Sequence, residues 1–189
     1  MTLTYSLYAD GSLQVTMNGT PYGKTPKILP RIGMQMGLHK EMERACWFGR
    51  GIGDSYPDRK HAAPVGLYDL PIRELNFEYD VPQETGSHED TRFVRIYGEN
   101  TGICAVGNFA YSCHDFTLEN LTAARHKNEL VYTETKYLYL DAKQRGIGSL
   151  SCGPDPEEEY ELPVSDFSFS FILMADKGNP AAFDKMRMI

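Results

Sequence analysis

The stretch Phe167-Ser168-Phe169-Ser170-Phe171-Ile172-Leu173 decides the fold class of this chain. Its Phe and Leu side chains occupy every second position, and a period of two places successive side chains on opposite faces of a β-strand. Three more stretches show the same alternation: residues 13–17, 93–97 and 137–140. Short strands repeated in this way predict an all-β chain folded as an antiparallel β-sandwich.

Residues between these stretches favour turns, and helical signals are few. Asp10-Gly11 and Asn18-Gly19 are typical turn pairs. Residues 118–124 follow Thr117, whose hydroxyl can cap a helix, so we predict one short helix on the rim of the sandwich. Residues 38–45 have a composition that also suits a helix, but Trp47-Phe48 follows directly, and we assign them to a strand.

Length and charge limit the classes of protein to which the chain can belong. The 189 residues fit one domain, 1–189, and 41% of them are hydrophobic. The net charge of -7 argues against a nucleic-acid partner, which needs a concentrated positive surface. No run approaches the roughly 18 apolar residues of a membrane span. Residues 1–10 lack the pattern of a signal peptide, so we expect a cytoplasmic protein.

The four cysteines are irregularly spaced. Cys46, Cys104, Cys113 and Cys152 form no C-x-x-C pair and have no histidine at zinc-finger spacing, so no structural zinc site is expected. We predict free thiols in a reducing compartment, and two disulfides are the alternative.

Three patterns contain the residue types of a functional site but lack its spacing. Gly49–Gly53 is glycine-rich, yet Tyr56-Pro57 follows in place of a helix, which indicates a strand-to-loop turn. His88-Glu89-Asp90 and His114-Asp115 have no further ligands at metal-site spacing. The acidic run 155–161 is typical of a solvated loop. We therefore assign no catalytic residue and no metal ligand from the residues alone.

Three long motifs, in a fixed order, resemble a known family. The first group is Leu29–Met34 (L-P-R-I-G-M), then W-F-G-R-G from Trp47 and S-Y-P-D-R from Ser55. The second is P-Q-E-T-G from Pro82, continuing to Arg92, and the third is Gln144–Pro154 (Q-R-G-I-G-S-L-S-C-G-P). From Leu29 onward the chain resembles the C-terminal domain of the large β-galactosidases of glycoside hydrolase family 2, which in some bacteria forms a separate small subunit.

The resemblance implies both a fold and a function. The family domain is a large sandwich similar to galactose mutarotase, and its first strands would precede this chain, leaving an apolar edge open to self-association. The family hydrolyses terminal β-D-galactosides such as lactose, with both catalytic carboxylates on a separate (β/α)₈ barrel. We therefore expect the barrel or large subunit as partner, an inactive isolated chain, and no cofactor in this chain, with Mg²⁺ and Na⁺ in the complete enzyme.

One loop of the family reaches the active-site mouth on the aglycone side of the substrate. The resemblance places Cys152 there, flanked by Ser151 and Gly153, as the substrate-binding residues. Some members have a tryptophan at that position, which stacks on a sugar ring, and cysteine cannot do so. The alternative is a cysteine that only packs in a turn.

The remaining motif residues are interpreted as structural: Arg31, Trp47, Tyr56, Asp58, Arg59, Glu84, His88 and Arg92. Arginine has several donors, so we predict buried networks for Arg59 beside Asp58 and for Arg92 near Glu84. Trp47 is expected in the core or at a domain interface. Three rival functions stay open: a stand-alone mutarotase-like epimerase, a carbohydrate-binding module with an exposed aromatic platform, and a pure assembly element.

Overall fold

Nine strands and a few helical turns make up the computed structural model, which describes residues 1–148 and 153–176. The strands are β1 (Thr2–Leu7), β2 (Leu13–Gly19), β3 (Arg31–Leu38), β4 (Arg44–Arg50), β5 (Val65–Pro71), β6 (His88–Tyr97), β7 (Gly102–His114), β8 (Lys136–Gln144) and β9 (Phe167–Asp176). The helical elements are α1 (Leu118–Ala123) and the 3₁₀ turns η1 (Ile72–Leu75), η2 (Lys127–Glu129) and η3 (Glu158–Tyr160).

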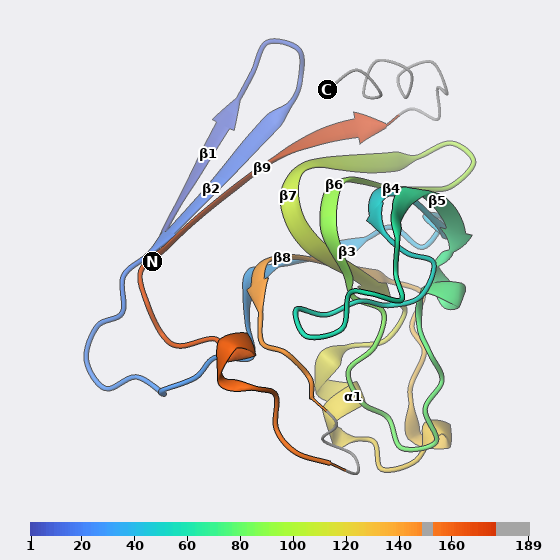
Figure 1. The fold of residues 1–189 in the computed structure, drawn as a ribbon. Coiled ribbons are helices and arrows are strands. Elements are labelled where there is room, and N and C mark those ends of the chain that lie inside the picture. The colour runs from blue at the N-terminus through green and yellow to red at the C-terminus, as the bar shows by residue number, and fades with distance from the viewer. Residues whose placement is uncertain (149–152, 177–189) are drawn as a thin grey trace.

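All strand pairs are antiparallel, and β7 lies at the branch point of the sheet. One edge of β7 pairs with β6, while the other pairs first with β9 (residues 102–107) and then with β8 (residues 110–114). Three arms therefore leave β7: β6-β4-β5, β9-β2-β1 and β8-β3. In Figure 1 the β1–β2 hairpin and the start of β9 extend away from the other strands, and the end of β9 runs beside β7. The predicted antiparallel all-β sandwich is confirmed.

The local predictions are mostly confirmed. All four alternating stretches lie within strands, namely β2, β6, β8 and β9. The predicted rim helix is α1, where the Thr117 hydroxyl oxygen accepts a hydrogen bond from the backbone N–H of Asn120 at 3.1 Å. The glycine-rich segment begins in β4 and leaves it after Arg50, as expected of a strand-to-loop turn.

The strand assigned to residues 38–45 is wrong over most of that range. β3 ends at Leu38, β4 begins at Arg44, and the residues between them form a turn in which the N–H of Met42 donates to the carbonyl of His39 at 3.0 Å. Within this turn Met42 packs into the core while its neighbours are exposed. One buried residue in a turn produces neither a helical nor a strand periodicity. The composition of residues 38–45 therefore could not reveal their secondary structure.

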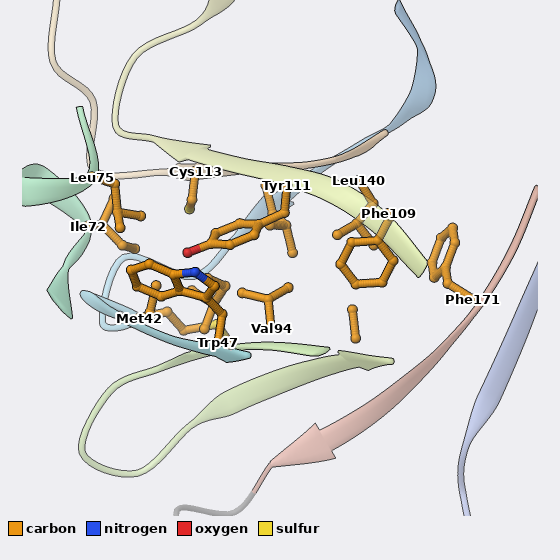
Figure 2. Packing of buried hydrophobic residues seen from close by; sticks show 14 of the residues in the cluster. Met42, Trp47, Ile72, Leu75, Val94, Phe109, Tyr111, Cys113, Leu140 and Phe171 are labelled. Carbon is orange, nitrogen blue, oxygen red and sulfur yellow. The ribbon is translucent and has the colours of Figure 1, made fainter. Parts of the chain in front are cut away.

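The core is built around Trp47, which is fully buried. Its ring lies 5.6 Å from that of Tyr111 in an edge-on arrangement and 5.2 Å from that of Tyr68, between centroids. The indole N–H donates to the carbonyl of Arg50 at 2.9 Å, which satisfies its polar atom. Figure 2 shows Trp47 and Tyr111 at the centre of the cluster, with Phe109 and Phe171 toward β9. Trp47 is therefore a core residue.

Three cysteines are buried in this fold. Cys46 and Cys113 are free thiols, and burial raises the pKa of each to about 12. Cys104 is buried as well, and Cys152 lies outside the described residues. In the part of the chain that the structure describes, no helix has the length and apolar character needed to cross a membrane.

We predict that Leu138→Ala lowers the free energy of unfolding by about 2–5 kcal/mol, because it leaves a cavity at a fully buried position of the core. Leu7→Ala is the matched control. Its side chain is exposed, and the change should stay within about 0.5 kcal/mol. Urea unfolding followed by the fluorescence of Trp47, the only tryptophan, measures both. Equal effects of the two substitutions would contradict this assignment of the core.

Candidate functional site

The loop after β8 contains the predicted substrate-binding residues, and its base is closed by Arg145. The guanidinium of Arg145 donates to both carboxylate oxygens of Glu161, at 2.8 and 2.7 Å, and to Asp155 at 3.3 Å. The N–H of Gly146 donates to the carbonyl of Tyr160 at 2.9 Å. Ser151 and Cys152 lie outside the described residues, and Gly153 is exposed. The two ends of the loop are thus joined across its base.

A second anchor comes from the S-Y-P-D-R motif. A carboxylate oxygen of Asp58 accepts a hydrogen bond from the N–H of Gly148 at 2.7 Å. Gly148 has a φ of +56°, and a Cβ there would lie 2.8 Å from the carbonyl oxygen of Pro154, so a side chain is excluded. Asp58 itself sits in a turn closed by two backbone hydrogen bonds between Tyr56 and Arg59. The first and third motifs therefore meet at this loop.

A partly buried ionic network joins all three motifs. Arg31 donates to Glu84 at 2.7 Å and to Asp141 at 3.2 Å. The side-chain amide of Gln144 donates to Glu84 at 3.2 Å and accepts from the Ser87 hydroxyl at 3.0 Å. Burial raises the pKa of Asp141 to about 7, although the charge of Arg31 opposes this. The network fixes the start of β3 and the end of β8, from which the loop departs.

The predicted partners of Arg59 and Arg92 are wrong. Arg59 is exposed and pairs with Asp54 at 2.8 Å, and its guanidinium lies 5.2 Å from the centre of the Tyr56 ring. Arg92 is exposed and lies 6.0 Å from the centre of the Phe48 ring. Its neighbours Thr91 and Phe93 are buried, so the alternation of β6 turns Arg92 toward solvent.

Sequence reasoning missed the roles of Asp141, Gln144, Arg145 and Glu161. Asp141 carries a detectable signal, because a carboxylate in the otherwise buried middle of a strand requires a cation nearby. Gln144 and Arg145 lay inside the third motif without an assigned partner. Glu161 was interpreted as part of a solvated acidic run, and it is the member of that run that closes the loop.

Both buried histidines are held neutral. The His88 ring stacks on Tyr111 with centroids 5.0 Å apart, and burial lowers its pKa to about 4. Burial also lowers the pKa of His114 to about 3, and its Nδ1 lies 2.6 Å from the side-chain oxygen of Asn76. Neither ring reaches solvent, so neither can exchange a proton with a sugar. Within residues 1–148 and 153–176, no group of three or more His, Cys, Asp or Glu side chains is placed to hold a metal ion.

The fold places the chain among antiparallel β-sandwich proteins, and its sequence places it in one family of them. The family described as "Beta galactosidase small chain" matches residues 1–173, so the match also includes the β1–β2 hairpin ahead of Leu29. The chain is 34% identical to a β-galactosidase of Actinobacillus pleuropneumoniae over 175 residues, 93% of this chain and 17% of that protein.

Two further relatives give the same picture. A β-galactosidase of Arthrobacter sp. (strain B7) is 38% identical over 71% of this chain and 14% of its own length. A β-galactosidase of Kluyveromyces lactis is 35% identical over 89% of this chain and 17% of its own length. The chain belongs to the β-galactosidase small-chain family, and it spans about a sixth of the length of these relatives.

We predict that Arg31→Ala lowers the free energy of unfolding by about 3–5 kcal/mol at pH 8, because it leaves the buried Asp141 carboxylate without its cation. The folded-state pKa of Asp141 lies above its reference value of 3.8, so its contribution to stability is greatest below that value and is lost as the pH rises through about 7. At pH 5 Asp141 is protonated, and the loss should be smaller.

Arg44→Ala is the control for this prediction. Arg44 pairs with Asp69 at the surface, where both side chains are partly exposed, and its removal should cost less than about 1 kcal/mol. Urea unfolding at the two pH values measures both variants. A loss for Arg31→Ala that is the same at pH 5 and pH 8 would contradict the role given to Asp141.

Proposed function

We propose that this chain completes the rim of the active site of a β-galactosidase whose catalytic carboxylates lie on a separate barrel part. The substrates are terminal β-D-galactosides such as lactose, hydrolysed with retention through a glycosyl-enzyme intermediate. The observation that carries the proposal is the loop after β8, which Asp58 holds at Gly148 and Arg145 holds at its base. These contacts fix the described parts of the loop before a partner binds, which lowers the ordering cost for those residues.

The tip supplies the contacts to the aglycone sugar. Cys152, with Ser151 and Gly153 beside it, is the proposed contact region, and a cysteine offers no ring face for stacking. We therefore expect weaker binding of the glucose unit of lactose than in relatives with an aromatic residue at this position. We propose no cofactor in this chain, and Mg²⁺ and Na⁺ in the complete enzyme.

We also propose a cytoplasmic location for the assembled enzyme. The free thiols of Cys46 and Cys113 suit a reducing compartment.

The isolated chain should not hydrolyse a nitrophenyl β-D-galactopyranoside, and mixing it with the catalytic part of a relative that lacks this segment should restore turnover. The reason is that both reacting carboxylates belong to the other part. Turnover by the purified chain alone, or no gain on mixing when the two parts do associate, would overturn the proposal.

In the reconstituted enzyme, Asp58→Ala should raise KM for lactose by about 2- to 10-fold, the range for loss of one hydrogen bond to the loop. The kcat for the nitrophenyl substrate should change less, because the reacting groups are elsewhere. Asp69→Ala, which removes a surface carboxylate, is the matched control. An unchanged KM for lactose in Asp58→Ala would separate this loop from the aglycone site.

We further propose that the isolated chain self-associates along β1. This strand pairs only with β2 in the described structure, and the segment Thr2–Leu7 contains no charged residue and no proline to block the free edge. One face of β1 carries Leu3, Tyr5 and Leu7, which are 39%, 56% and 77% exposed. The strand is uncharged, so two copies can pair along it without repulsion.

Tyr5→Lys should therefore shift the isolated chain toward monomer, because a charge on an edge strand opposes pairing. Leu67→Lys places the same charge on β5, the strand at the other end of the sheet, and should leave the mass distribution unchanged. Sedimentation velocity over a range of concentrations measures both. A wild-type chain that stays monomeric throughout, or equal effects of the two variants, would exclude this interface.

A further inference from the structure

A cavity of about 340 Å³ lies beside α1. It is formed by residues 73–85, which lead from η1 toward β6, and by residues 115–132, which contain α1 and η2. In Figure 1 both segments lie at the same end of the molecule as α1. No described residue between 145 and 161 lines this cavity.

Aromatic rings make up much of the cavity wall. Phe77 and Tyr79 form one pair, with centroids 4.6 Å apart, and Phe116 and Tyr132 form another, 6.1 Å apart and edge-on. Phe77 is 64% exposed and Tyr132 is 51% exposed, so each offers ring surface to a ligand. This is the exposed aromatic platform that a carbohydrate-binding site requires.

Polar side chains in the same wall provide both donors and acceptors. The buried carboxylate of Asp115 is fixed by Arg73 at 3.3 Å and by Lys136 at 3.8 Å. The Arg73 side chain lines the cavity, is 80% exposed and has further donors beyond its contact with Asp115. The side-chain amides of Gln83 and Asn128 make no hydrogen bond to other residues of the described chain and can each donate and accept.

The cavity is held open by hydrogen bonds within its walls. The N–H of Phe77 donates to the Thr85 hydroxyl at 2.8 Å, which joins the two ends of the first segment. The N–H of Val131 donates to the side-chain oxygen of Asn120 at 2.7 Å, which ties the second segment to α1. A site that is formed before binding loses less entropy when a ligand enters.

We propose that this cavity binds a pyranose ring, as a second carbohydrate site. A pyranose has a face of C–H groups that packs on an aromatic ring, and hydroxyl groups that need paired donors and acceptors. The volume lies within the range of small-molecule sites, and this lining of exposed rings with a fixed carboxylate matches both needs. The inference does not depend on the proposed role in a β-galactosidase active site.

Saturation-transfer NMR on the purified chain with methyl β-D-galactopyranoside tests this site. We expect saturable binding with a Kd on the order of millimolar, as is typical of a small polar ligand in a shallow site. Galactitol, an open-chain polyol that lacks the ring, should show no saturable signal. Phe77→Ala and Tyr132→Ala should each raise the Kd about 2- to 10-fold, the scale of losing a stacked ring.

Tyr22→Ala is the matched control, because Tyr22 is 97% exposed and does not line the cavity. Each variant should keep the wild-type urea midpoint, which shows that a loss of binding is not a loss of folding. No saturable binding of the galactoside, equal binding of galactitol, or unchanged affinity in both ring variants would overturn the site. Reconstitution of hydrolysis plays no part in this readout, so failure of the barrel partnership would leave the result intact.

Discussion

The branched pairing of β7 is the constraint on which the rest of this structure depends. A strand with one partner along one edge and two successive partners along the other must change its surroundings halfway along. Its second half, residues 109–114, is buried throughout, because the sheet curls over both of its faces. Buried and exposed side chains therefore do not alternate in this half of β7, and polar side chains such as His114 are buried as well.

The consequence of that curl is a set of buried polar groups that must be satisfied internally. Arg31, Glu84 and Asp141 do this with charge. His88 stays neutral and, among the described residues, pairs only through its Nδ1, with the carbonyl of Arg50 at 3.2 Å. Such networks contribute little net stability compared with apolar packing, but breaking one partner is costly. They therefore set the geometry of the strand ends more than the overall stability. The loop after β8 begins at one of these strand ends, so the network also sets where the loop starts.

The fold class was predictable from the alternating stretches, because one-sided burial leaves a period of two in the chain. The turn between β3 and β4 was not predictable, since a lone inward Met42 has no period. Partners of charged residues were not predictable either. Arg59 pairs with Asp54, 5 positions away, and not with the adjacent Asp58. Glu84 pairs with Arg31, 53 positions away, and not with the nearby Arg92. Closeness in the sequence was therefore a poor guide to these ion pairs.

For the candidate loop, the motif resemblance identified the segment, but its anchors emerged only from three-dimensional contacts. Asp58 accepts a hydrogen bond from Gly148, which lies 90 positions away in the sequence. A local sequence pattern cannot predict a contact between residues so far apart in the chain. The aromatic cavity beside α1 shows the same limitation. Phe77 and Tyr132 are unremarkable in separate loops, and they define a site only because the sheet brings those loops together.

The buried thiols described with the core have a chemical consequence. Burial holds Cys46 and Cys113 in the protonated form at neutral pH, and the thiolate is the species that reacts with oxidants and alkylating agents. Both side chains are also shielded from collision with such reagents in the folded chain. Modification at these two positions therefore requires transient unfolding of the sandwich. The rate of thiol modification then measures how often the folded chain opens.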